Sequence, residues 1–115
     1  MKEKKLIPFV NDMFALVFQA FKNLYPRKKC KCQWVPKITD ENGRDVYGST
    51  EYLVEERIFL VEISATLSVM NAVEVLAHEL AHVAAGPDAE HGKEWEDAFN
   101  AIYEEYERLG LEMIK

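Results

Sequence analysis

The sequence predicts an α+β fold in which an N-terminal helix, a three-stranded antiparallel sheet, a second helix and a C-terminal helix follow one another. Two observations predict it. Apolar residues recur every three or four positions near both ends of the chain, whereas the stretch between them contains runs that alternate apolar and polar residues. Of the 115 residues, 49% are hydrophobic and 30% are charged, which is typical of a folded globular protein. A chain of this length is most simply one compact unit, so we expect a single domain over residues 1–115.

The first predicted helix covers residues 6–24. Its apolar residues follow the spacing of a helix that is buried on one side: Leu6, Val10, Met13, Val17, Ala20, Phe21 and Leu24. Pro8 suits the first turn of such a helix, and Pro26 is expected to stop it.

Three further runs predict the strands of the sheet. Residues 30–34 alternate apolar and polar side chains, which is the period of a half-buried strand. Asn42 and Gly43 form a hairpin-turn signal before a second run, residues 46–53. Residues 58–63 are rich in branched apolar side chains and predict a third strand. Because short connections join antiparallel neighbours, the three runs predict an antiparallel meander.

The second predicted helix starts between Ser68 and Asn71, either of which could cap it, and ends at Gly86 and Pro87. One side of this helix carries an apolar stripe that is expected to face the core: Val69, Val73, Leu76, Leu80 and Val83. The other side carries Asn71, Val75, His78, His82 and Ala85. The two histidines are therefore expected to point away from the core, toward a cleft.

The last predicted helix buries one face, marked by Trp95, Phe99, Ile102, Tyr106 and Leu109, and is expected to end at Gly110. Tyr103 and Tyr106 could donate hydrogen bonds to a reacting oxygen. Their position on this helix favours a place in the core or at its boundary.

The segment His78-Glu79-Leu80-Ala81-His82 carries the strongest functional signal. Two histidines four apart on a helix point the same way and can bind one metal ion, and His91 could supply a third ligand from beyond the helix end. Three protein ligands leave one position of a Zn²⁺ ion for water, as in hydrolytic sites. Glu79 would lie beside the ligands and accept a proton from that water. A carboxylate such as Glu94 is the main alternative to His91.

The spacing beyond the second histidine separates the groups of zinc peptidases. Gly86 and His91 lie four and nine residues after His82, whereas metzincins need three and six. The run of residues 91–95, His-Gly-Lys-Glu-Trp, instead resembles the HGxx(F/W) element that follows HExxH in SprT-like metallopeptidases, which include Spartan-type DNA-dependent proteases. The order of the predicted elements is similar to that family as well.

The resemblance implies a minimal zincin fold with His78, His82 and His91 as zinc ligands and Glu79 as the catalytic acid and base. SprT-like proteins often carry a C-terminal zinc ribbon. The sequence contains no cysteine after Cys32, so we expect the catalytic domain without that ribbon.

The function that these observations predict is zinc-dependent hydrolysis of peptide bonds in a protein or peptide substrate. The alternative is a zinc-stabilised binding module without catalysis, associated with nucleic acid through the basic segment 27–31. Charge is divided unevenly: residues 1–44 carry a net charge of +6, from 10 basic and 4 acidic side chains, whereas the rest carries −12. The acidic part contains the HExxH segment and disfavours close approach of DNA there, which weakens the link of the family to DNA.

A cytoplasmic location is expected. Lys2, Lys4 and Lys5 precede an apolar stretch, as in a secretory signal, but polar residues interrupt that stretch and no small-residue cleavage site follows. No apolar run is long enough to span a bilayer, so we expect no membrane partner.

Overall fold

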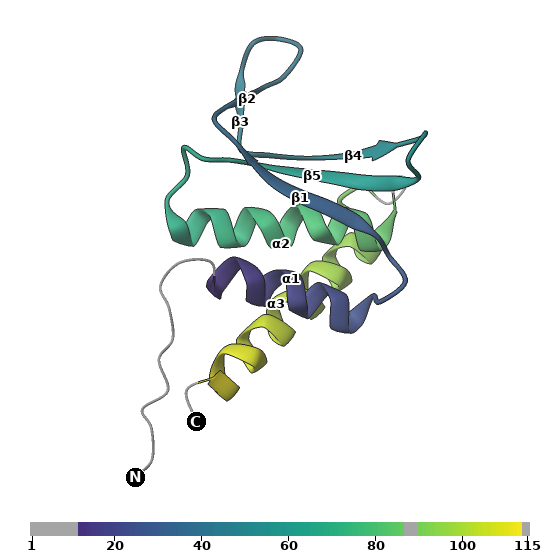
Figure 1. Cartoon of the computed structure of the whole chain (residues 1–115), viewed down its shortest axis with the longest axis vertical. Coiled ribbons are helices and arrows are strands. Elements are labelled where there is room, and N and C mark those ends of the chain that lie inside the picture. Colours follow the sequence, from purple (N-terminus) through teal and green to yellow (C-terminus); the bar gives the residue numbers. More distant parts are fainter. Residues whose placement is uncertain (1–11, 87–89, 114–115) are drawn as a thin grey trace.

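The computed structural model describes residues 12–86 and 90–113 of the chain, which form an α+β fold with three helices and a small mixed sheet (Figure 1). In chain order the elements are α1 (Asp12–Leu24), β1 (Cys30–Val35), β2 (Ile38–Thr39), β3 (Asp45–Val46), β4 (Gly48–Leu53), β5 (Ile58–Ser64), α2 (Val69–Ala85) and α3 (Lys93–Met113). The succession of helix, strands, helix and helix is the predicted one.

The helix α2 lies between the sheet and the other two helices (Figure 1). Small and branched side chains on one broad side of this helix are buried: Ala72, Val73, Leu76, Ala77, Leu80, Ala81 and Val83. Alanines let neighbouring elements approach closely, and the branched residues fill the space between them. The core therefore lies against the buried side of α2, with Val17 and Phe21 from α1, Val61 from β5 and Ile102 from α3.

The sheet differs from the predicted antiparallel meander. Its strand order is β1-β5-β4, in which β4 pairs antiparallel with β5 but β1 pairs parallel with β5, with Cys30 opposite Phe59. The predicted turn at Asn42 and Gly43 exists, and Gly43 has a φ of 77°, but the turn closes a separate hairpin of β2 and β3. That small hairpin lies between β1 and β4 in sequence, and β1 pairs with β5 instead of β4.

The central place of β5 follows from its composition. Val61, Ile63 and Ser64 of β5 are buried, and pairing on both sides satisfies the backbone of such a strand. The edge strand β1 leaves Cys32 and Trp34 exposed instead of half-buried. The prediction of an antiparallel three-stranded sheet was thus wrong in the orientation and neighbour of its first strand.

The ends of the helices agree with most of the predicted signals. Ser68 caps α2 by accepting a hydrogen bond from the backbone N–H of Asn71, at 3.4 Å, and Gly86 follows the helix with a φ of 93°. Val69 was expected in the core but is exposed, because it is the first residue of α2. The helix α1 ends at Leu24, before the predicted stop. Residues 6–11 of the first predicted helix, and Pro87, lie outside the described residues.

The helix α3 runs through Gly110 to Met113, so the prediction that it ends at Gly110 was wrong. A single glycine inside a helix costs only about 1 kcal/mol relative to alanine. Arg108 binds Glu105 on one side and Glu112 on the other, at 2.7 and 2.9 Å, and the second of these ion pairs spans the glycine. None of the helices in the described part of the chain has both the length and the apolar character that crossing a bilayer requires.

Candidate metal centre

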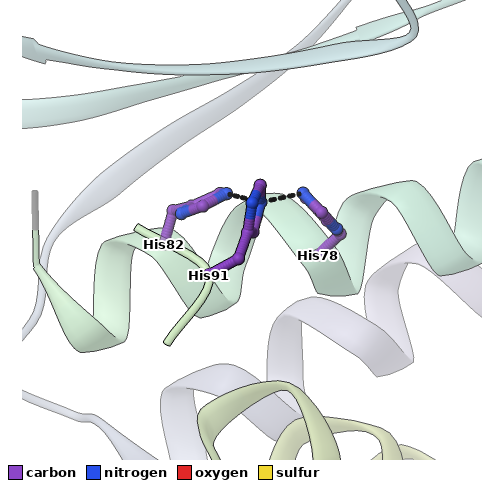
Figure 2. A group of neighbouring side chains, drawn as sticks. All are labelled: His78, His82 and His91. Carbon is purple, nitrogen blue, oxygen red and sulfur yellow. Dashed lines mark hydrogen bonds between the residues drawn. The ribbon is translucent and has the colours of Figure 1, made fainter. Parts of the chain in front are cut away.

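Three histidine side chains converge at the exposed side of α2. His78 and His82 project from successive turns of the helix, and His91 approaches from the segment that leads into α3 (Figure 2). The Nε2 atom of His91 lies 3.1 Å from Nε2 of His82 and 3.2 Å from Nε2 of His78. The structure therefore brings the three histidines that the sequence singled out to one point.

The spacing of these nitrogen atoms fits a bound metal ion. Tetrahedral Zn²⁺ with Zn–N bonds of 2.0–2.1 Å places its ligand nitrogens about 3.3 Å apart, close to the two distances between the histidines. The ligand atoms of all three residues lie within 4.8 Å of one another. The cluster could thus hold a metal ion, and its three imidazoles are donors that zinc and other divalent transition metals accept.

The surroundings keep two of these imidazoles in the form that binds metal. Burial, together with the charges of the other two histidines, lowers the pKa of His82 to about 4. Burial, and then the charge of His91, also lowers the pKa of His78 below the usual histidine value. Because a metal ligand must be the neutral imidazole, both side chains are available to a cation at neutral pH.

Trp95 packs against the whole cluster from the first turn of α3. Its indole ring lies 4.7, 4.8 and 5.7 Å from the rings of His78, His91 and His82, measured between centroids. Its Nε1–H donates a hydrogen bond of 3.1 Å to the backbone carbonyl of His78, and its ring stacks on that of Phe99. The sequence predicted Trp95 as a core residue, but its contact with all three histidines depends on how α3 crosses α2.

Glu79 is buried although it is charged, with 7% of its surface exposed. The hydroxyl of Thr50 in β4 lies 2.6 Å from its Oε1 atom and donates a hydrogen bond to it. Burial raises the pKa of Glu79, whereas the bond from Thr50 and the charge of His91 lower it. A buried carboxylate next to the histidine cluster, with its pKa raised, is suited to accept and release protons.

Sequence reasoning placed Glu79 beside the cluster but missed Thr50. A lone threonine in a strand carries no signal of its own, because its meeting with Glu79 depends on which edge of the sheet lies over α2. Two other candidates lie elsewhere. Glu94 is exposed and outside the histidine cluster, and Tyr103 packs against the core, as expected. Four basic side chains of segment 27–31 are exposed, namely Arg27, Lys28, Lys29 and Lys31.

Comparison with known proteins gives one match. The model of the SprT-like family matches residues 10–113, which include the three histidines, Glu79 and Trp95. No curated protein and no solved structure matches the chain.

Proposed function

Because this chain belongs to the SprT-like family, we propose that it is a zinc-dependent metallopeptidase that hydrolyses peptide bonds. The observation that carries the proposal is the convergence of three Nε2 atoms beside a buried carboxylate, that of Glu79. Three imidazoles and one neighbouring carboxylate are the set of groups that a single-zinc hydrolase uses.

His78, His82 and His91 would hold the zinc ion through their Nε2 atoms. When bound, zinc supplies a Lewis acid that polarises the substrate carbonyl and lowers the pKa of a water molecule to about 7. Trp95 would keep the three rings in place, since it contacts each of them and is itself bonded to the backbone of α2.

Glu79 would act as the general base and then as the general acid. Its carboxylate takes a proton from the attacking water and later gives that proton to the leaving amine. The raised pKa favours the second transfer, because a carboxyl group that binds its proton more tightly remains protonated for longer near neutral pH. No covalent bond between the protein and its substrate is needed.

The test of this proposal combines metal content with cleavage. The purified protein is expected to contain about one zinc ion per chain by mass spectrometry of the metal, and His91→Ala is expected to lose it. Glu79→Gln is expected to keep the zinc and to slow cleavage of fluorescent casein by a factor of about 10² to 10⁴. A protein without zinc, or a Glu79→Gln variant as active as the unchanged chain, would refute the proposal.

The same experiment distinguishes catalysis from a binding role. A non-catalytic module would bind zinc in stoichiometric amount and cleave no casein. A structure of the zinc-loaded protein would then show the fourth coordination position closed by a protein side chain. If nucleic acid is a further partner, the affinity of the protein for DNA falls as the salt concentration rises. Replacing Lys28 and Lys29 by uncharged residues then abolishes the binding.

A further inference from the structure

Two residues of the edge strand β4 lie directly against Glu79. Alternate residues of a strand face the same side, so Gly48 and Thr50 share the face that covers α2. The hydroxyl of Thr50 contacts the carboxylate of Glu79, and the backbone of Gly48 lies against the same side chain. Both contacts join elements that are far apart in the sequence.

The hydroxyl of Thr50 has a single proton and two acceptors, both of which belong to Glu79. Oε1 of the carboxylate lies 2.6 Å away, and the backbone carbonyl oxygen lies 3.1 Å away. The carboxylate is the closer and, when ionised, the stronger acceptor. The hydrogen bond therefore restrains the side-chain torsion angles of Glu79.

Gly48 makes this contact sterically feasible. A Cβ atom at position 48 would lie 2.9 Å from Cγ and 3.0 Å from Oε2 of Glu79, and 2.6 Å from Cγ1 of Val75. Distances this short would push β4 away from α2 or displace the carboxylate. The missing side chain leaves room for Oε2 while Thr50 holds Oε1.

We infer that Gly48 and Thr50 are positioning residues for Glu79, which hold its carboxylate in one orientation beside the histidine cluster. The inference rests on the proposed function, in which Glu79 transfers the proton. A purely structural alternative is that Thr50 only satisfies a buried polar group. The two roles differ in what the loss of the hydroxyl does to turnover when the fold and the metal content are kept.

The first experiment replaces Thr50 in the zinc-loaded protein. Thr50→Val keeps the shape of the side chain and removes the hydroxyl, whereas Thr50→Ser keeps the hydroxyl. Thr50→Val is expected to lower kcat for casein cleavage about 10-fold to 100-fold with KM and zinc content unchanged, because a small misplacement of a reacting group has effects of that size. Thr50→Ser is expected to recover most of the loss.

Ser49→Ala is the matched control, because Ser49 lies on the same strand, pairs with Glu62 of β5 and faces the other side of the sheet. It is expected to leave kcat unchanged. The inference is overturned if Thr50→Val keeps the original kcat, if Thr50→Ser is as slow as Thr50→Val, or if Ser49→Ala is equally slow.

The second experiment measures stability and does not require the protein to be catalytically active. In metal-free protein, urea unfolding is followed for Thr50→Val, Glu79→Met and the double variant. If the hydroxyl of Thr50 binds the carboxylate of Glu79, Thr50→Val lowers the urea midpoint of unfolding in the unchanged chain. In the Glu79→Met background, the same substitution is expected to lower the midpoint less than half as much. Equal shifts in both backgrounds overturn the inference. An inactive protein with coupled midpoints overturns the proposed function alone.

Discussion

At the scale of single residues, the neutral imidazole of His82 makes the metal-free protein sensitive to acid. The unfolded chain binds a proton at this residue near pH 6.5, whereas the folded chain does so only near pH 4, since burial lowers the pKa to about 4. Between these values the unfolded state binds more protons, so stability is expected to fall as the pH falls from 6.5 to 4. Urea unfolding with a chelator present, at pH 7, 6 and 5, measures the effect.

His82→Asn is the control for this prediction, because asparagine does not titrate. As the pH falls from 6.5 to 4, the free energy of unfolding is expected to fall more for the unchanged chain than for the variant. Parallel curves for the two proteins would contradict the assignment of the effect to His82.

The carboxyl of Glu79 has the opposite dependence. Because burial raises its pKa in the folded state, the folded chain binds this proton more tightly than the unfolded chain. Its contribution to stability is therefore lost as the pH rises above the ordinary glutamate value. Glu79→Gln is expected to melt at a higher temperature than the unchanged metal-free protein at pH 8, with a smaller difference at pH 5, as measured by differential scanning fluorimetry. A variant that melts lower at pH 8 would show that the carboxylate stabilises the fold.

At the scale of the elements, the glycine inside α3 offers a test of helix propensity. Gly110 lies in the last turns of the helix, and an added Cβ would meet no atom within 4 Å. Gly110→Ala is expected to stabilise the protein by about 0.5–1 kcal/mol, seen as a higher urea midpoint. Gly43→Ala is the matched comparison, since Gly43 has a φ of 77° with equally open space, and it is expected to destabilise. If both substitutions change the stability in the same direction, the space around the added Cβ atom determines the effect and the backbone conformation does not.

The elements also show which parts of the fold can be predicted from the sequence. The boundaries of α2 and the common side of His78 and His82 depend on residues at most a few turns apart, so spacing and capping signals suffice. The parallel pairing of β1 with β5 joins residues about thirty positions apart, and the turn at Gly43 closes a different hairpin. The hydrogen bond between Thr50 and Glu79 depends in turn on that sheet. The placement of a single domain over residues 1–115 stays a prediction.

For the whole molecule, the histidine cluster joins α2 to the start of α3. A metal ion held by residues of both segments would bind the folded chain in preference to the unfolded chain, and it would stabilise the folded chain by up to about 2.7 kcal/mol when its free concentration is 100 times the dissociation constant. Removal of metal by a chelator is expected to lower the melting temperature, and added zinc to restore it. His91→Ala is expected to melt at the same temperature with and without zinc. A zinc-dependent rise in that variant would show that the ion binds elsewhere.

The contact between α1 and α3 affects how the chain can fold during synthesis. These helices are in contact and cross each other (Figure 1). Val17 and Phe21 of α1 share a core with Ile102 of α3. A nascent chain that has emerged from the ribosome only as far as β5 lacks α3, which packs on α1, and α2, which covers the sheet. The apolar faces of α1 and of the sheet are therefore expected to stay exposed until α2 and α3 have been synthesised and have left the ribosome, so the fold forms as one unit rather than strand by strand.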